Sequence, residues 1–167
     1  MLVRAGDERD LPAIAAIGRM RAEPFRFHLD RDSNLIQYAI AKKRLLAGLG
    51  PPGAREVQFF VAEEGASAVA YVVLSSRDRD WVLEEAGDRD PAGARLGAIL
   101  QALIARQPSE SRPTIRGRMP AGFLPPQISI VEARPTADVM MIRPLAGTDL
   151  SPPLAEGDVL YWQGDVF

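Results

Sequence analysis

The sequence lacks cysteine altogether, and this absence removes several classes of site. It excludes a disulfide framework, a thiolate zinc site, an iron–sulfur cluster and a cysteine nucleophile. Long apolar runs are also missing, since no window holds about 18 consecutive apolar residues, the length that a membrane helix needs. The N-terminus has charged residues where a secretory signal has an apolar stretch. We therefore expect a cytoplasmic protein.

An excess of charge of one sign is missing as well. The chain has 20 Lys and Arg against 22 Asp and Glu, which gives a net charge of −2. Such a balance creates no field that attracts nucleic acid or a membrane surface, and we expect neither as a partner. With 167 residues, 47% of them hydrophobic, the chain has the size and composition of one globular domain.

Hydrophobic periodicity predicts the order of helices and strands. A short strand at residues 2–4 precedes two helices with apolar residues at helical spacing, and Ser33 is the predicted N-cap of the second helix. The period then changes to two in a three-strand meander at residues 57–63, 69–74 and 81–86. A helix with an apolar stripe from Leu96 to Ile104 follows. We predict further strands of the same sheet in the apolar runs at residues 114–118, 128–131 and 139–142.

The last 24 residues differ in composition from the rest of the chain. Residues 144–167 contain four acidic residues and no Lys or Arg, together with three prolines. We interpret residues 1–143 as a domain and residues 144–167 as an acidic extension that packs on it, with an edge strand at residues 159–162. The large apolar residues near the C-terminus favour packing on this domain or on a neighbouring copy.

A turn with small residues joins the third meander strand to the amphipathic helix. Residues 90–100 read DPAGARLGAIL, with glycines at Gly93 and Gly97. A helix N-terminus offers unpaired N–H groups and the positive end of the helix dipole, and small residues let an anion approach closely. The turn therefore predicts a pyrophosphate cradle. The alternative is that the two glycines only shape the turn.

The order of elements over residues 2–143 resembles the GNAT family of N-acetyltransferases. Of that family's Q/R-x-x-G-x-G/A motif, Gly97 matches the last glycine, whereas Ala92 replaces Gln or Arg and Arg95 replaces the first glycine. The resemblance implies an α/β (α+β) fold of the acyl-CoA N-acyltransferase type. That fold has a mixed, mainly antiparallel sheet of six or seven strands flanked by helices, and we expect it to splay near Glu85 to Gly87.

The resemblance also implies a co-substrate, acetyl-CoA or another acyl-CoA, and no metal. Arg95 either reaches the phosphates or fills the cradle. The residues expected to bind the co-substrate are Ala86, Gly87, Gly93, Ala94, Arg95, Leu96, Gly97 and Ala98.

Acyl transfer to an amine needs a base for the ammonium proton and an acid for the departing thiolate. Glu84 and Glu85 end the third meander strand, and strand alternation predicts that they lie on opposite faces. At most one of them then points into the site. We favour Glu85 as the base because it lies nearer the expected splay, and a solvated strand end is the alternative for both.

The acid has no obvious source. Many family members supply it from a tyrosine after the fifth strand, but residues 119–126 contain none. Tyr38 and Tyr71 lie in apolar periodic segments, and we interpret them as core residues. Tyr161 is the substitute if the C-terminal extension folds back across the cleft.

The connector between the first two helices contains Phe25, Arg26, Phe27 and His28. The resemblance implies that these residues border the acceptor pocket, and the alternative is a surface loop whose aromatic rings pack in the core. His28 is the single histidine, and without cysteine or clustered carboxylates it predicts neither a metal site nor a catalytic triad.

Together these features predict an N-acetyltransferase that moves an acetyl group from acetyl-CoA to an amine of a small molecule or peptide. The alternative is a non-catalytic module of the same fold that binds acyl-CoA or a protein. The altered motif and the missing tyrosine favour that alternative. We also expect a homo-oligomer or a larger assembly through the C-terminal extension.

Overall fold

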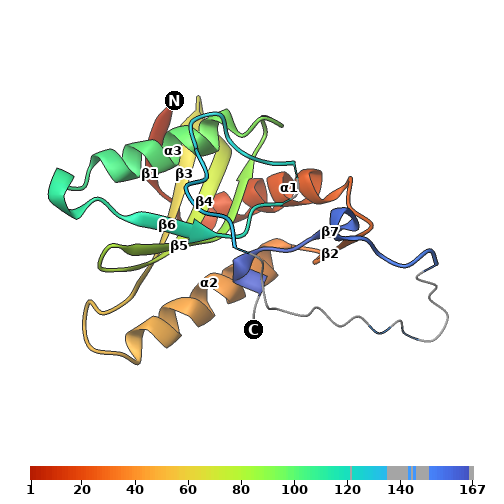
Figure 1. The fold of residues 1–167 in the computed structure, drawn as a ribbon, viewed down its shortest axis with the longest axis horizontal. Helices are drawn as coiled ribbons and strands as arrows, with labels where there is room; N and C mark the ends of the chain where they lie inside the picture. The colour runs from red at the N-terminus through yellow and green to blue at the C-terminus, as the bar shows by residue number, and fades with distance from the viewer. Residues whose placement is uncertain (121, 135–142, 144, 146–150, 166–167) are drawn as a thin grey trace.

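The computed structural model describes residues 1–120, 122–134, 143, 145 and 151–165. Figure 1 shows a central sheet with α3 (Ala94–Ala105) on one face. The helices α1 (Leu11–Ala22) and α2 (Ser33–Gly48) cover the other face. Within these residues, no helix combines the length and apolar character needed to cross a membrane.

The main sheet has five strands in the order β1-β3-β4-β5-β6. Neighbouring strands are antiparallel except for the parallel pair β5 and β6. The strands are β1 (Leu2–Ala5), β3 (Glu56–Glu64), β4 (Ser67–Arg77), β5 (Asp80–Asp88) and β6 (Thr114–Gly117). A second sheet pairs β2 (Phe27–His28) in parallel with β7 (Val159–Leu160).

This architecture confirms the predicted mixed, mainly antiparallel sheet flanked by helices. The described main sheet has five strands instead of six or seven. The strand expected at residues 128–131 is wrong: Ile128 packs on the core, but Ile130 is 61% and Val131 98% exposed. A turn in which Ile128 N–H donates to the Pro125 carbonyl replaces the extended chain there. The strand expected at residues 139–142 lies outside the described residues.

The N-cap of α2 also differs from the prediction by one position. The Asp32 carboxylate, not Ser33, accepts a hydrogen bond from the Leu35 N–H at 2.7 Å. A carboxylate at the N-cap satisfies one of the free N–H groups of the first turn and interacts favourably with the helix dipole.

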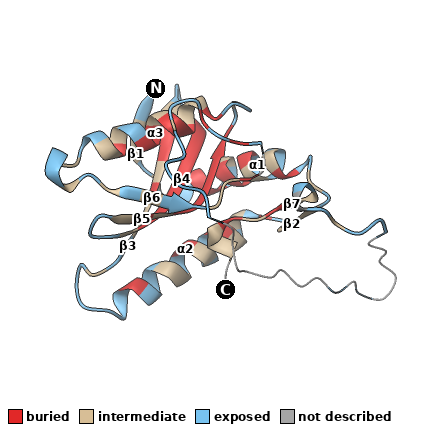
Figure 2. Ribbon diagram, viewed as in Figure 1, coloured by how far each residue is buried: buried red, intermediate tan, exposed pale blue. Residues whose placement is uncertain are grey.

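Alternation along β4 divides the core between the two faces of the sheet. Val72 and Leu74 pack with the buried stripe of α3, whereas Tyr71 and Val73 pack with α1 and α2. Figure 2 shows this buried layer in the strands and in the helix surfaces that face them. Each fully buried aliphatic side chain contributes about 1.5–3 kcal/mol, so the sheet is held from both sides.

Gly87 in β5 provides a test of this packing. A Cβ at this position would lie 2.5 Å from Tyr71 Cε1 and 2.8 Å from Ile17 Cγ2, both in the buried core. We expect Gly87→Ala to lower the free energy of unfolding by about 1–3 kcal/mol, because a filled core accepts extra volume only with strain. Urea denaturation measures the change.

Gly48→Ala is the matched control, because a Cβ on this last residue of α2 meets no atom within 4 Å. This variant should be as stable as wild type or up to about 1 kcal/mol more stable. Equal stability of Gly87→Ala and Gly48→Ala would contradict the tight packing of β5 on α1.

Candidate functional site

The parallel strands β5 and β6 part within the sheet. Their ladder runs from Asp80 opposite Thr114 to Leu83 opposite Gly117. β5 continues to Asp88, so beyond Leu83 its edge has no strand partner on this side within the described residues. The opening therefore begins beside Glu84, close to the expected splay.

A register shift places Glu84 and Glu85 on the same face of the sheet. Val73 pairs with Glu85 and Leu74 pairs with Leu83, so Glu84 is the extra residue of a β-bulge. Both carboxylates contact groups on the α1 and α2 side. The prediction of opposite faces is wrong, because a bulge interrupts the alternation on which it rested.

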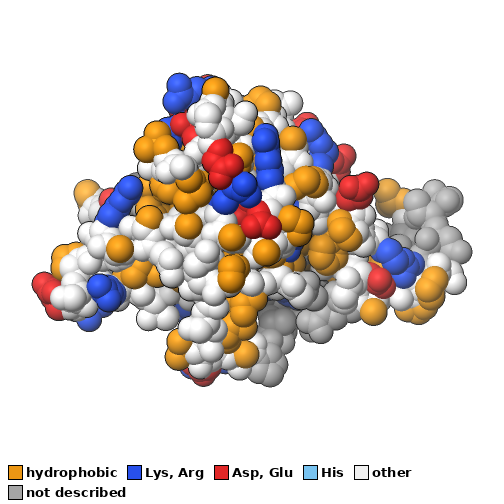
Figure 3. Space-filling view, turned by 90° about the horizontal axis from the view of Figure 1, so that it is seen from above, with side chains coloured by type: hydrophobic (Ala, Val, Ile, Leu, Met, Phe, Trp, Pro, Cys, Tyr) orange, Lys and Arg blue, Asp and Glu red, His pale blue; other side chains and the backbone are white. Residues whose placement is uncertain are grey.

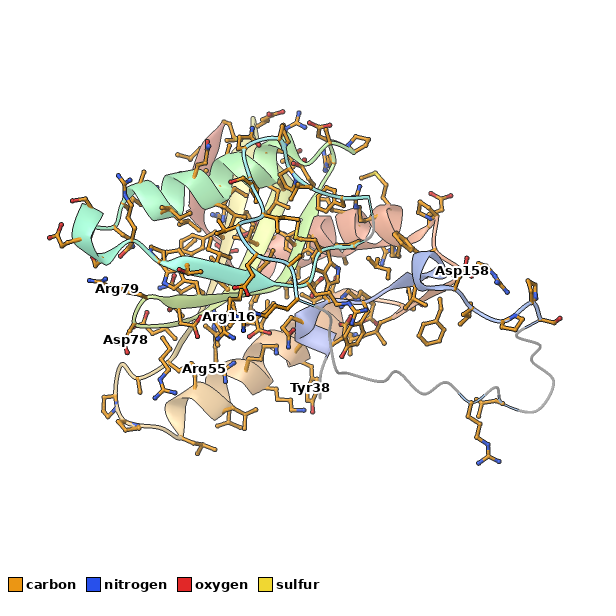
Figure 4. The ribbon with its side chains drawn as sticks, in the orientation of Figure 1. Tyr38, Arg55, Asp78, Arg79, Arg116 and Asp158 are labelled. Atoms are coloured by element: carbon orange, nitrogen blue, oxygen red, sulfur yellow. The ribbon has the colours of Figure 1, made fainter. Side chains whose placement is uncertain are left out.

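Glu84 is buried and bonded through both carboxylate oxygens. Its Oε1 accepts from Ser75 Oγ at 2.5 Å and from Arg55 Nη2 at 3.3 Å, and its Oε2 accepts from Lys43 Nζ at 3.1 Å. Arg55 comes from the loop after α2 (Figure 4). Two cations and a hydroxyl thus compensate this buried charge.

Glu85 belongs to a second buried group, which links distant parts of the chain. Tyr71 Oη donates to Glu85 Oε1 at 2.6 Å, and Arg31 Nε lies 3.1 Å from the same oxygen. Arg31 also forms an ion pair with Asp165. The four side chains come from β4, β5, the connector before α2 and the 3₁₀ helix η4 (Gln163–Asp165).

Burial and neighbouring charge set the protonation of this group. Burial raises the pKa of Tyr71 well above its ordinary value, and Glu85 adds to the shift, so the phenol stays protonated and donates. Burial lowers the pKa of Arg31, but Glu85 and Asp165 more than offset it, so its net pKa is raised. Burial also raises the pKa of Asp165, although Arg31 opposes the shift.

The C-terminal segment covers the opening between β5 and β6. After β7, Trp162 is buried in the same cluster as the stripe of α3, and η4 contacts β5. A Cβ on Gly164 would lie 2.7 Å from the Glu84 carbonyl oxygen. Figure 1 shows this blue turn next to α2, below the end of β6. Tyr161 lies beside it, with the Arg118 guanidinium 5.1 Å from its ring centre.

The same segment also covers the connector that was expected to border the acceptor pocket. Phe27 and His28 form β2 and pair with β7, and Phe25 packs against the core. Arg26 Nη1 lies 3.2 Å from Asp158, which Figure 4 shows on the C-terminal segment. His28 Nδ1 lies 3.1 Å from the Phe25 carbonyl oxygen.

The turn before α3 satisfies several of its own N–H groups with carboxylates. Asp88, which is buried, accepts from Leu96 N–H at 2.8 Å and from Asp90 N–H at 2.8 Å. Asp90 in turn accepts from Ala92 N–H at 3.0 Å.

Side chains from the segment after β6 lie over the two glycines of this turn. A Cβ on Gly97 would lie 2.0 Å from Gln127 Oε1, and a Cβ on Gly93 would lie 2.7 Å from the Phe123 ring. Ala86 and Leu96 are core residues beneath them. In this arrangement the turn does not fit a pyrophosphate, because Asp88 supplies an anion of its own and Gln127 covers the approach.

Arg95 stands at the rim of the turn and is partly exposed. Its guanidinium bonds Glu64 in a bidentate pair at 2.8 and 3.1 Å and lies 3.8 Å from Asp88. Glu64 raises the pKa of Arg95 through this hydrogen bond. Figure 3, viewed from above, shows acidic and basic side chains interspersed on this face.

One cavity lies away from the opening between β5 and β6. It has a volume of about 280 Å³ and is lined by residues of the β1–α1 turn, α2 and β3, including Gly6, Gln37, Arg44 and Phe59. A cavity of about 10 Å³ borders Glu84, Glu85, Lys43 and Gly164. Among the described residues, no group of three His, Cys, Asp or Glu is arranged to hold a metal.

Sequence reasoning missed Arg31 and Asp165 as members of the site, and it assigned Tyr71 to the core alone. Arg31 lies in an irregular connector, and Asp165 follows 134 residues later in the extension. No periodicity links such positions. The one available signal was a tyrosine at a buried strand position, where its hydroxyl must find a partner.

The similarity of this chain to known proteins is one of fold. No protein-family model matches the sequence, and no curated protein does. Among solved structures, the chain is similar to the crystal structure of a ribosomal-protein-alanine N-acetyltransferase from Brucella melitensis, with a TM-score of 0.48 and 19% sequence identity. The similarity covers 67% of this chain and 70% of that one, and it concerns the fold.

Proposed function

We propose that the chain is an N-acyltransferase that moves an acyl group from a thioester donor, acetyl-CoA or another acyl-CoA, to an amine. The acceptor is a small molecule or a peptide. The proposal rests on the parting of β5 and β6 beyond Leu83, directly beside the buried carboxylates Glu84 and Glu85. A bound donor supplies an activated acyl group with a thiolate as leaving group.

Glu85 is the proposed base that takes the proton of the acceptor ammonium. Both oxygens of Glu84 are already bonded to Ser75 and to cations, which leaves Glu85 as the better choice. Tyr71 and Arg31 orient the Glu85 carboxylate. A positioned base of this kind contributes about 10²- to 10⁴-fold to the rate.

In this mechanism the leaving thiolate takes its proton from solvent. Tyr161, the acid expected from the sequence, lies on the C-terminal segment that crosses the opening, directly before Trp162, and takes no part. No donor contact at the turn before α3 forms part of this mechanism.

The second candidate is a non-catalytic module of the same fold. The observation that favours it is the buried Asp88 carboxylate on the Leu96 N–H, where a phosphate-binding turn would need a free donor. The two candidates separate first on donor affinity and then on turnover.

Substitution of Glu85 tests the base. We expect Glu85→Gln to lower the rate of acyl transfer by about 10²- to 10⁴-fold at neutral pH while sparing acetyl-CoA binding. Raising the pH should restore part of the loss, because more of the acceptor amine is then unprotonated. An acyl-transfer assay between pH 6.5 and 9.5 on an active amine measures both effects.

Glu84→Gln is the companion variant, because it removes a buried carboxylate of the same bulge. It should lower stability by leaving Lys43 and Arg55 without their anion, with a smaller effect on turnover. Equal activity of wild type and both variants would remove both glutamates from the mechanism.

Asp88→Asn separates the two candidate functions. If the turn binds a phosphorylated donor, removal of this buried negative charge should raise the affinity for acetyl-CoA, and added salt should shrink the gain. Titration calorimetry measures the affinity, with the more exposed Asp90→Asn as control. Absence of binding in wild type and in both variants would favour a non-catalytic module that binds a protein and not acyl-CoA.

The Tyr71 phenol gives a pH-dependent prediction. Its pKa is raised in the folded protein, whereas an unfolded tyrosine ionises near pH 10, so stability should fall as the pH rises above about 10. Tyr71→Phe should remove this part of the pH dependence. Urea denaturation at several pH values, together with the ultraviolet absorbance of tyrosinate, tests this prediction. If the free energy of unfolding depends on pH in Tyr71→Phe as it does in wild type, the pH dependence does not come from Tyr71.

A further inference from the structure

We propose that the C-terminal segment 159–165 is an autoinhibitory strap that closes the donor opening and must leave before an acyl donor binds. The inference rests on the proposed function, because it concerns access to the same opening.

The strap occupies the backbone edge that a donor would need. Beyond Leu83, the edge of β5 has lost β6, and η4 contacts it instead. The approach is close, because a Cβ on Gly164 would lie 2.7 Å from the Glu84 carbonyl oxygen. An unpaired strand edge binds extended groups that carry amides, so a donor arm and the strap would compete for the same edge.

The strap and the cover over the turn before α3 share one hydrophobic cluster. Leu160 and Trp162 of the strap are buried in the cluster that also contains Phe123, whose ring lies over Gly93. Partly buried Met119 and Ile128, on either side of Phe123, pack against the same cluster. Release of the strap therefore withdraws apolar support from the segment that covers the turn.

Release of the strap breaks the ion pair of Asp165 but leaves no buried cation unpaired. Arg31 bonds both Asp165 and Glu85, so it keeps a buried carboxylate partner when the strap leaves. The other ion pair of the segment, Asp158 with Arg26, lies on more exposed side chains, where such pairs contribute little.

Two glycines in the same segment give a matched pair of variants. A Cβ at Gly164 meets the Glu84 backbone, so Gly164→Ala should push the strap away from β5. A Cβ at Gly157 meets no atom within 4 Å, so Gly157→Ala should leave the strap in place. Hydrogen exchange of the amides of residues 159–165 reports release, and calorimetry with acetyl-CoA reports donor affinity.

We expect Gly164→Ala to exchange faster in this segment and to bind acetyl-CoA at least about tenfold more tightly than wild type. The gain follows because apparent affinity scales with the fraction of open molecules. Gly157→Ala should match wild type in both measurements. Asp165→Asn should also release the strap, because it removes the charge that pairs with Arg31. Thermal melting followed by circular dichroism checks that each variant is folded.

The possible outcomes distinguish a failure of the strap proposal from a failure of the proposed function. Faster exchange without a gain in acetyl-CoA affinity, in a protein that does bind acetyl-CoA, overturns the strap and leaves the proposed function standing. Unchanged exchange in both Gly164→Ala and Asp165→Asn also overturns it, because these contacts would then not hold the segment. Released variants that bind no acetyl-CoA and transfer no acyl group overturn the proposed function together with the strap.

Discussion

The buried guanidinium of Arg31 is the interaction on which the rest of the site depends. It joins the connector before α2 to β5 through Glu85 and to the C-terminal segment through Asp165. An unpaired charge at this depth would cost several kcal/mol. Without Arg31, two buried carboxylates would face each other across the opening. The same guanidinium therefore both holds the C-terminal segment against the sheet and fixes the position of the Glu85 carboxylate at the opening.

Local patterns were enough to predict most of the fold. The stripe of α3 and the three long strands of the meander follow directly from periods of 3.6 and 2. The short apolar run at residues 128–131 failed as a strand because its length alone does not fix a structure. Tandem prolines precede it, a tight turn forms at its start, and three of its four residues are exposed.

The site was less predictable, because its contacts depend on tertiary structure. The positions of Glu84 and Glu85 at the strand end could be identified, but their shared face could not, since a bulge leaves no reliable mark in one sequence. Asp88 had no recognised role in the sequence, although it caps the very turn that the glycines suggested. Long-range ion pairs such as Arg31 with Asp165 leave no periodic trace at all.

The bulge at Glu84 has a consequence for any alignment of this strand with another protein. Because side chains alternate along a strand, one extra residue reverses the face of everything that follows it. A sequence comparison that matches β5 without a gap at Glu84 would assign Glu85 and Gly87 to the wrong side of the sheet. Equivalent positions in this strand must therefore be counted backwards from Asp88, not forwards from Asp80.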